Sequence, residues 1–373
     1  MAGPVVFVGS EHATAREDTE GAARRAGVEA SLCWDVEEAR TLLARADLAA
    51  PRCVVVDLEL PDLEGFIGWL RGEAHLFPVP VVVQVSHPDD ALYLQAHSLG
   101  ADDVVVRGDD AGITRRLRNL SDFDPTARPP KTQGSAVVAH GNELRRRVLG
   151  RILRQAGFDV SFALDADDLV RVAHGMPQTP VLMVADAALP GAGAIHAVRA
   201  VRGRAGFDGV PVVLTAEADE VGALRGAAEG MGDAAVTHEA APPDNLLFLA
   251  NELLRPDVRN VRASTRVLYG TICAFRRAGT LVPVYGLTYN ISREGLYVRT
   301  LDPPAPGTDL WLEMRPPRVG GAVHLRAKAV WARGLRNPGG AAPPGFGVRL
   351  VDGGPADDRA AYETGYEGLA SAG

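Results

Sequence analysis

A duplicated pattern of short buried strands is the feature that most restricts the fold of this chain. Between residues 4 and 254, valine-rich apolar runs alternate with amphipathic stretches that have helical spacing and charged faces. Such runs are typical of parallel strands with helices on both faces, so the alternation favours a doubly wound α/β fold. The expected strands are Val5–Val8, Cys53–Leu58, Val79–Ser86 and Asp103–Arg107, then Ser135–His140, Pro180–Asp186, Val210–Ala216 and Ala234–His238.

The two copies lie one domain length apart. Matching positions are separated by 131, 129 and 131 residues, far more than a solenoid repeat. The matching pairs are Val5 with Ala136, Asp57 with Asp186, and Arg107 with His238. The Pro-containing stretch Phe123–Gly134 reads as a linker, and Pro256 should end the second copy. We therefore expect α/β domains at residues 1–122 and 134–255.

Four short motifs stand at or after the expected strands of these domains. They are DLELPDLEG at Asp57–Gly65, DAALPGAGA at Asp186–Ala194, GADDVVVRG at Gly100–Gly108 and VLTAEAD at Val213–Asp219. In this order and spacing, the motifs resemble the receiver domains of response regulators. The resemblance implies a flavodoxin-like fold in which a strand-end aspartate is the phosphoacceptor. It also implies a Mg²⁺ ion held by an acidic pair after the first strand, and a lysine after the fifth strand.

Both copies depart from that chemistry. Gly9-Ser10 and His140-Gly141 stand in place of the acidic pair, although Glu11 follows in the first copy. Arg107 and His238 stand in place of the lysine. A divalent ion would lose most of its charge-neutralising ligands, so we interpret both domains as degenerate pseudo-receivers that serve as scaffolds for protein contacts.

Asp57 and Asp186 remain candidate phosphoacceptors. Both carboxylates can also persist only as groups that cap the loop after a strand. We favour this loop-capping interpretation over phosphorylation.

The pattern changes after Val258 to short, roughly alternating β-rich stretches separated by Gly/Pro turns. Evenly spaced strands of this kind predict a small antiparallel barrel of about six strands. We expect this all-β domain at residues 257–353, followed by a C-terminal tail at 354–373.

The net charge of −8 is unevenly distributed along the chain. Residues 1–124 carry 11 basic and 22 acidic side chains, residues 125–256 carry 13 and 15, and residues 257–373 carry 15 and 10. The net charges are therefore −11, −2 and +5. This local excess of arginine favours an anionic partner for the last domain, although a solvated basic surface is an equal alternative.

Two short motifs follow each other at the start of the last domain. Arg262 and Arg266 form an R-x-x-x-R motif, and Asn290, Ser292 and Gly295 form N-x-S-x-x-G after an interval of 23 residues. With these motifs the domain resembles the PilZ domain, a bacterial receptor fold for cyclic di-GMP, and AVWARG at 329–334 and GFGVRL at 345–350 are similar to the closing strands of that family. Turn chemistry alone explains an isolated Asn, Ser or Gly, but the ordered set favours PilZ.

The resemblance implies roles for these side chains. Arg262 and Arg266 would grip the phosphates and guanines of cyclic di-GMP, a dianion, because an arginine fork pairs with phosphate and with guanine O6 and N7. Asn290 and Ser292 would donate or accept hydrogen bonds on the barrel. Gly295 would permit a close backbone approach or a positive φ. Arg259 and Arg293 are further candidate contacts.

Other functions receive little support from the sequence. Catalytic and metal-ligating constellations do not stand out, and a helix-turn-helix does not follow the receiver-like copies, so we expect neither an enzyme, nor a resident metal, nor a DNA-binding protein. Membrane-length apolar segments and a signal peptide are likewise not evident, which predicts a cytoplasmic protein without membrane insertion.

The favoured hypothesis is a non-enzymatic effector. It would bind cyclic di-GMP through the PilZ-like domain and relay occupancy to an unidentified protein partner through the pseudo-receivers, in motility, polysaccharide or biofilm control. The alternatives are a phosphorylation-dependent response regulator that uses Asp57, and an adaptor that binds no nucleotide.

Overall fold

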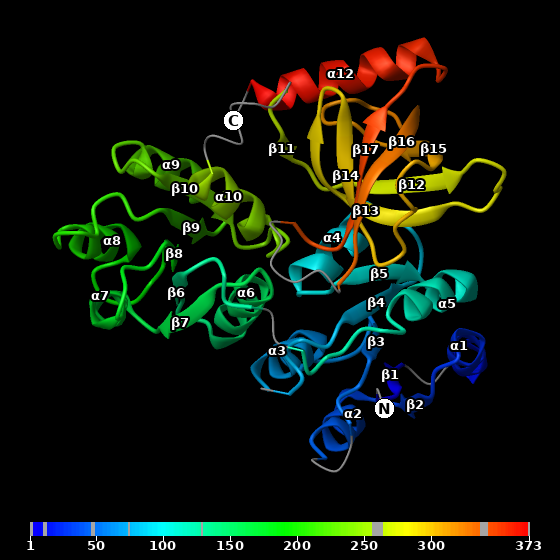
Figure 1. Ribbon diagram of the computed structural model, residues 1–373, viewed down its shortest axis with the longest axis horizontal. Coiled ribbons are helices and arrows are strands. Elements are labelled where there is room, and N and C mark those ends of the chain that lie inside the picture. Colours follow the sequence, from blue (N-terminus) through cyan, green and yellow to red (C-terminus); the bar gives the residue numbers. More distant parts are fainter. Residues whose placement is uncertain are drawn as a thin grey trace.

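A computed structural model of the chain forms three lobes, two α/β domains and one barrel, as seen in Figure 1. It describes residues 3–9, 13–45, 49–73, 75–127, 130–255, 264–335 and 342–371.

The first α/β domain is a five-stranded parallel sheet of order β2-β1-β3-β4-β5. The buried side chains of its first strand point alternately to the two faces of the sheet. Val6 and Val8 join the core on one face, and Val5 and Phe7 join the core on the other. The strands are β1 Val5–Val8, β2 Ala30–Cys33, β3 Cys53–Asp57, β4 Val81–Val85 and β5 Asp103–Val106. The helices are α1 Ala13–Ala26, α2 Val36–Leu43, α3 Leu63–Gly72, α4 Asp90–Ser98 and α5 Asp110–Asn119.

The second α/β domain repeats this arrangement as β7-β6-β8-β9-β10. Both orders are 2-1-3-4-5 in local numbering, the order of the flavodoxin-like fold that receivers share. Its strands are β6 Ser135–Ala139, β7 Asp159–Ala163, β8 Leu182–Asp186, β9 Val212–Ala216 and β10 Ala234–His238. Its helices are α6 Glu143–Gln155, α7 Ala166–Gly175, α8 Ala194–Arg202, α9 Val221–Ala228 and α10 Asn245–Leu254.

Helix starts are also duplicated. The Asp35 side chain accepts a hydrogen bond from the Glu38 amide at 2.8 Å, and the Asp165 side chain accepts one from the Asp168 amide at 2.8 Å. An aspartate in this position satisfies one of the unpaired amides of the first helical turn. Both copies therefore begin their second helix by the same local device.

The C-terminal lobe is a closed antiparallel barrel. Strand order β13-β12-β15-β16-β17-β14 is closed by a β13–β14 pairing, and β11 adds to β13 outside the ring. The predicted fold classes of all three lobes are thus confirmed. The strands are β11 Val267–Leu268, β12 Ile272–Arg277, β13 Val284–Ser292, β14 Gly295–Arg299, β15 Asp309–Met314, β16 Val323–Arg333 and β17 Gly345–Leu350.

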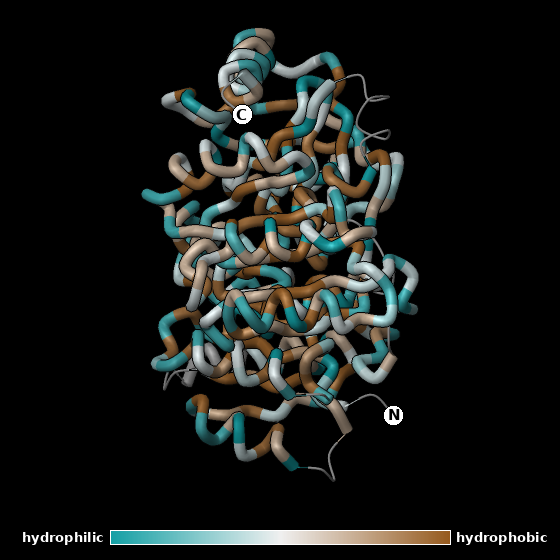
Figure 2. The backbone as a smooth tube through the Cα atoms, turned by 90° about the vertical axis from the view of Figure 1, so that its left-hand side faces the viewer, coloured by the Kyte–Doolittle hydropathy of each residue, from teal (hydrophilic) through white to brown (hydrophobic). Residues whose placement is uncertain are grey.

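The barrel interior is apolar. Figure 2 shows that hydrophobic residues, in brown, gather in the inner segments of the backbone throughout the molecule. Phe275 and Phe346 meet there edge to face, with ring centroids 4.9 Å apart.

A helix covers one side of the barrel within the segment treated above as a tail. This helix, α12 (Ala356–Ala370), lies across the top of the barrel in Figure 1. Its Tyr362 and Tyr366 are buried in the barrel core. A pair of tyrosines four residues apart on one helix face explains why this short charged helix docks instead of remaining in solvent.

The barrel is attached to the first α/β domain through two aspartates. Asp103 of β5 accepts hydrogen bonds from the Leu301 amide at 2.6 Å and the Thr300 hydroxyl at 3.1 Å. Asp90 accepts them from the Ile272 amide at 2.6 Å and the Thr271 hydroxyl at 3.0 Å. These contacts place the barrel against the β5 edge of the sheet.

The two α/β domains meet through α3 and α6. At this interface the buried Asp102 accepts hydrogen bonds from Arg71 at 3.1 Å and from Arg151 at 2.8 Å. Within the described ranges, no helix has both the length and the apolar character that a membrane crossing requires.

Candidate functional site

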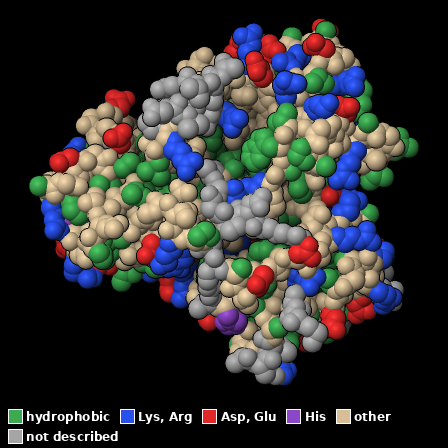
Figure 3. All heavy atoms as spheres, viewed as in Figure 1, with side chains coloured by type: hydrophobic (Ala, Val, Ile, Leu, Met, Phe, Trp, Pro, Cys, Tyr) green, Lys and Arg blue, Asp and Glu red, His purple; other side chains and the backbone are tan. Residues whose placement is uncertain are grey.

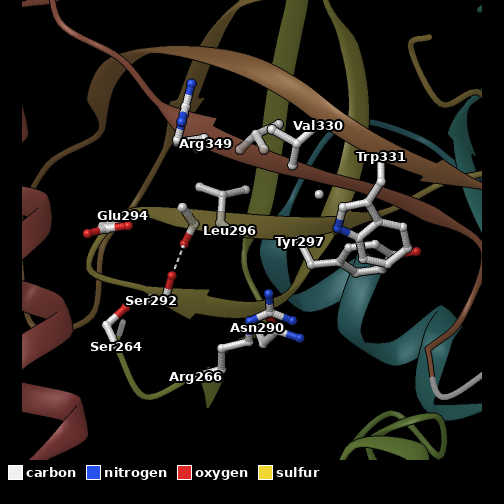
Figure 4. A pocket seen from close by; sticks show the side chains of 13 residues that line it. Ser264, Arg266, Asn290, Ser292, Glu294, Leu296, Tyr297, Val330, Trp331 and Arg349 are labelled. Carbon is white, nitrogen blue, oxygen red and sulfur yellow. Dashed lines mark hydrogen bonds between the residues drawn. The ribbon is translucent and has the colours of Figure 1, made fainter. Parts of the chain in front are cut away.

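An open pocket of about 360 Å³ lies on the barrel, between the ends of several strands. Pockets for small molecules commonly have roughly 300–1,000 Å³. Figure 4 shows side chains from β13, β14, β16 and β17, and from residues just before β11, converging on it. The lining residues are Ser264, Arg266, Asn290, Ser292, Glu294, Gly295, Leu296, Tyr297, Val330, Trp331, Gly347, Val348 and Arg349.

Four residues singled out from the sequence line this one pocket: Arg266, Asn290, Ser292 and Gly295. Arg266 and Asn290 lie next to each other in Figure 4. Arg293 does not line the pocket, because its guanidinium faces α12, 3.6 Å from the Glu363 carboxylate. Two other predicted contacts, Arg259 and Arg262, lie outside the described residues.

The tight turn between β13 and β14 fixes the Ser292–Gly295 part of the motif. The Ser292 hydroxyl donates to the Gly295 carbonyl oxygen at 3.1 Å. The Tyr362 hydroxyl of α12 lies 2.8 Å from the Ser292 carbonyl oxygen and 3.0 Å from that of Gly295. The helix therefore holds the turn from behind, a role that the sequence motif does not reveal.

Gly295 is required because two strands approach closely. A Cβ atom on Gly295 would lie 2.1 Å from the Val348 carbonyl oxygen, too close for any larger residue. Its φ is not in the positive range. Of the two expected reasons for this glycine, the close backbone approach is the one that applies.

One wall of the pocket is aromatic. The Trp331 indole stacks on the Tyr297 ring, with centroids 4.8 Å apart and planes 22° apart. Trp331 remains 38% exposed. Gly347 makes room for it, since a Cβ there would lie 2.3 Å from the indole nitrogen. Exposed flat rings of this kind can stack on planar ligands.

Sequence reasoning missed the Trp331 wall. The available signal was a tryptophan within AVWARG, one residue after Val330, in a strand whose apolar and polar residues otherwise alternate.

The charges around the pocket favour an anion. Arg266 and Arg349 line it together with one acidic residue, Glu294. The Tyr297 hydroxyl donates to the Pro343 carbonyl oxygen at 2.6 Å, and burial raises the pKa of Tyr297, so this phenol stays neutral. Figure 3 shows further Lys and Arg side chains along the outer edge of the barrel and the first α/β domain.

In the first α/β domain, the candidate phosphoacceptor Asp57 is engaged in an ion pair with Arg107. One Asp57 carboxylate oxygen lies 2.6 Å from the Arg107 guanidinium, and the other accepts the Glu59 amide at 3.0 Å. Gly9 supplies no carboxylate at the adjoining strand end. The described residues therefore do not fit a Mg²⁺ ion here, and Glu11 lies outside them.

In the second α/β domain, the matching strand ends carry a histidine and two carboxylates, His140, Asp186 and Glu239. Asp186 accepts the Ala188 amide at 3.1 Å, as Asp57 accepts the Glu59 amide in the first copy. Its other carboxylate oxygen lies 3.6 Å from His140 Nδ1, and His140 Nε2 lies 2.8 Å from a Glu239 carboxylate oxygen. The imidazole replaces the hard oxygen ligands that Mg²⁺ prefers, so this crevice does not fit Mg²⁺ either.

The grouping of His140, Asp186 and Glu239 was not foreseen, because Glu239 was not singled out. All three residues stand at or directly after the carboxyl ends of β6, β8 and β10. Carboxyl ends of parallel strands meet at one edge of a sheet, so this rule could have found the group.

Comparison with known proteins assigns the barrel and its helix. Residues 260–365 match the family described as PilZ domain. No curated protein matches the chain.

Several solved structures are similar to the chain. A probable two-component system response regulator/GGDEF domain protein has 18% identity and a TM-score of 0.32, covering 68% of this chain and 98% of its own. A chemotaxis response regulator of Vibrio cholerae has 18% identity and a TM-score of 0.30, covering 33% and 100%. The receiver domain of a sensor histidine kinase from Pseudomonas aeruginosa PAO1 has 17% identity and a TM-score of 0.29, covering 32% and 96%.

Proposed function

We propose that this chain, which carries a PilZ domain behind two receiver-like α/β domains, is a non-enzymatic signalling protein that binds cyclic di-GMP on its barrel. The observation that carries the proposal is the convergence of Arg266, Asn290, Ser292 and Gly295 on one open pocket. Arg266 precedes Asn290 by 24 positions in the sequence, yet the two side chains share a single surface with an aromatic wall.

The chemistry of the pocket suits this dianion. Arg266 can pair with a phosphate or with a guanine edge, and Arg262 would do the same from the segment that precedes the first barrel strand. Asn290 and Ser292 supply hydrogen-bonding groups on the barrel itself. The stacked Trp331 and Tyr297 rings supply an apolar face for a guanine base.

The relay to the α/β domains is supported by where the barrel is attached. Strand β13 carries Asn290 in the pocket and, one residue earlier, Tyr289 at the second α/β domain. Arg299, at the end of β14, pairs with Asp244 of that same domain. A ligand that favours one arrangement of β13 and β14 would therefore bias the docking of the second α/β domain.

The partner side of the proposal rests on the degenerate receivers. With Arg107 on Asp57, and His140 beside Asp186, the two domains offer surfaces for protein contact instead of phosphoryl chemistry. The PilZ assignment favours outputs in motility, surface polysaccharide or biofilm control.

Calorimetric titration of the full-length chain with cyclic di-GMP tests the binding proposal. We expect the wild type to bind, and Arg266→Ala to bind at least tenfold more weakly, since a bidentate arginine contact is worth roughly 1–3 kcal/mol. Arg262→Ala should behave similarly. Arg315→Ala, which removes an exposed arginine outside the pocket lining, is the matched control and should retain wild-type affinity.

Two results would reject this function. Wild-type protein that binds no nucleotide would favour the adaptor alternative. Unchanged affinity in an Arg262→Ala/Arg266→Ala double variant would place the ligand elsewhere.

A further inference from the structure

The group formed by His140, Asp186 and Glu239 lies in the second α/β domain, far from the barrel pocket in sequence and in fold. Their imidazole and carboxylate ligand atoms all lie within 4.8 Å of one another. The three side chains are only 4%, 9% and 19% exposed. Two carboxylates are thus held together in a largely desolvated place, which is unfavourable unless a positive charge joins them.

No described Arg or Lys side chain forms an ion pair with either carboxylate of this group. The Asn142 amide donates to His140 Nδ1 at 3.0 Å, and His140 Nε2 faces Glu239. Within the described structure, the two carboxylates share this imidazole and have no Arg or Lys partner.

The first α/β domain provides an internal comparison. Its aspartate at the matching strand end, Asp57, is neutralised by Arg107 at 2.6 Å. The positions that match His140 and Glu239 are Gly9 and Gly108, so these two positions supply no ligand side chain in that copy. The second copy has lost the arginine and gained two ligand side chains at the same edge of the sheet.

A second observation points to an occupant of this site. Thr215, at 6% exposure, has a hydroxyl group with no hydrogen-bond partner in the described structure. It lines a cavity of about 30 Å³ together with His140 and Glu239. A cavity of this size has room for about one water molecule, and polar groups of His140, Thr215 and Glu239 lie among its otherwise largely apolar lining. A hydroxyl directed at such a cavity suits a water molecule or hydroxide bound to a metal ion.

We propose that the second α/β domain binds a divalent transition-metal ion of the Zn²⁺ class through His140, Asp186 and Glu239, with the Thr215 hydroxyl bonded to a metal-bound water. One imidazole nitrogen and two carboxylates form a donor set that suits Zn²⁺. The 2.8 Å between His140 Nε2 and the Glu239 oxygen is a hydrogen-bond distance, and binding would widen it to the ~3.3 Å that separates two ligands of one tetrahedral Zn²⁺.

The ligand set differs from that of a magnesium-dependent receiver, because it needs an imidazole and a carboxylate after the fifth strand. The site is independent of cyclic di-GMP binding. Its function would be to fix the loops that follow β6, β8 and β10, as the Arg107–Asp57 pair does in the first copy.

Titration of Zn²⁺ into the full-length, metal-stripped protein tests this proposal. We expect one tight Zn²⁺ site per chain, with affinity at least tenfold lower in Glu239→Gln and in His140→Ala. Co²⁺ in place of Zn²⁺ should give visible absorption bands in the wild type that are lost in both variants. Glu239→Gln is nearly isosteric and partly exposed, so it tests the site even if His140→Ala fails to fold.

His324→Ala is the matched control. His324 also lies between two carboxylates, 3.6 Å from Glu313 and 3.4 Å from Asp358, but on the exposed barrel surface. It should leave the tight site intact. Absence of tight Zn²⁺ binding, binding unchanged by Glu239→Gln, loss of the site in His324→Ala, or preference for Mg²⁺ over Zn²⁺ would each overturn the proposal.

Discussion

The Tyr289 hydroxyl donates a hydrogen bond to the main-chain carbonyl oxygen of Asp244 at 2.9 Å, and this bond crosses from the barrel to the second α/β domain. The Tyr289 ring also meets Phe248 of α10 edge to face, with centroids 6.2 Å apart. On its other side it contacts Tyr297 at 5.8 Å, and Tyr297 stacks on Trp331. A continuous row of four rings thus connects the pocket with α10.

Removing the Tyr289 hydroxyl should loosen α10. Tyr289→Phe loses one buried hydrogen bond, worth about 1 kcal/mol, and should increase hydrogen exchange of the α10 amides. The control is Tyr269→Phe. The Tyr269 hydroxyl donates to the Arg315 carbonyl oxygen at 2.9 Å, inside the barrel domain. Equal exchange of α10 in the two variants would show that Tyr289 does not hold this interface.

If the pocket binds a guanine base, Trp331 should contribute to affinity by stacking. Trp331→Ala should weaken cyclic di-GMP binding about tenfold or more, because base–aromatic stacking is worth roughly 1–3 kcal/mol per base. Trp311 is a close control, since it is 39% exposed and lies on β15 outside the pocket. Affinity is measured by calorimetry. A similar loss of affinity in Trp311→Ala and Trp331→Ala would show that base stacking on Trp331 does not contribute to binding.

Asp102 should be among the most sensitive polar residues for stability. Burial would raise its pKa, but Arg151 and Arg71 outweigh that effect and hold the pKa of Asp102 below its usual value. Burial and the neighbouring Arg151 lower the pKa of Arg71 to about 9. Without the carboxylate, two buried guanidinium groups would repel each other across the α3–α6 interface.

Asp102→Asn should therefore reduce the free energy of unfolding by about 3–5 kcal/mol, measured by urea titration at neutral pH. Asp159→Asn, which breaks the exposed Lys131 pair, should cost about 1 kcal/mol or less. Because the native pKa of Asp102 is lowered, its contribution is present above the unfolded pKa of about 3.9 and is lost as the pH falls through the native value.

The stability of the protein should fall in mild acid because of His97. Burial, and then the nearby Arg299, lower the pKa of His97 well below its usual value. Its Nδ1 atom lies 3.2 Å from the Ala101 carbonyl oxygen, and Nε2 has no hydrogen-bond partner in the described structure. The unfolded chain therefore takes up a proton near pH 6.5 that the native state resists.

Between pH 7.5 and 5.5, the wild type should lose about 1.4 kcal/mol more free energy of unfolding than His97→Gln. Urea titrations at both pH values provide the measurement. The exposed His324→Gln should follow the wild type. Identical pH dependence in wild type and His97→Gln would mean that His97 is protonated with equal ease in the native state.

Phosphoryl donors should not modify the first α/β domain. Acetyl phosphate with Mg²⁺ should leave the intact mass of the protein unchanged, because Arg107 forms an ion pair with the Asp57 carboxylate and Gly9 offers no metal ligand. A phosphorylated product in the wild type that disappears in Asp57→Asn would instead support the response-regulator alternative.

The fold was predictable because its strands are marked locally. Val5–Val8 and Ala234–His238 have the bounds expected from their apolar runs, and Asp57 and Asp186 end their strands one domain apart. The N-x-S-x-x-G motif was equally local, since Asn290 lies near the end of β13 and Ser292 and Gly295 flank the tight turn that follows. Their roles in ligand binding stay predictions.

The parts that were not predictable depend on contacts between distant segments. Helix α12 has no strong apolar face in sequence, and only its docking shows that Tyr362 supports the Ser292–Gly295 turn. The position of Trp331 in the pocket depends on the absence of a side chain at Gly347, on the neighbouring strand.

The sequence by itself determined three lobes, their fold classes and a basic last domain, because strand periodicity, turn residues and charge are properties of contiguous residues. Only the tertiary structure decided which side chains share a site. Barrel closure brought Arg266, Asn290 and Trp331 to one pocket, and parallel strand ends brought His140 to Glu239. Such pairings depend on sheet order and register, which fix distances between residues that no local pattern connects.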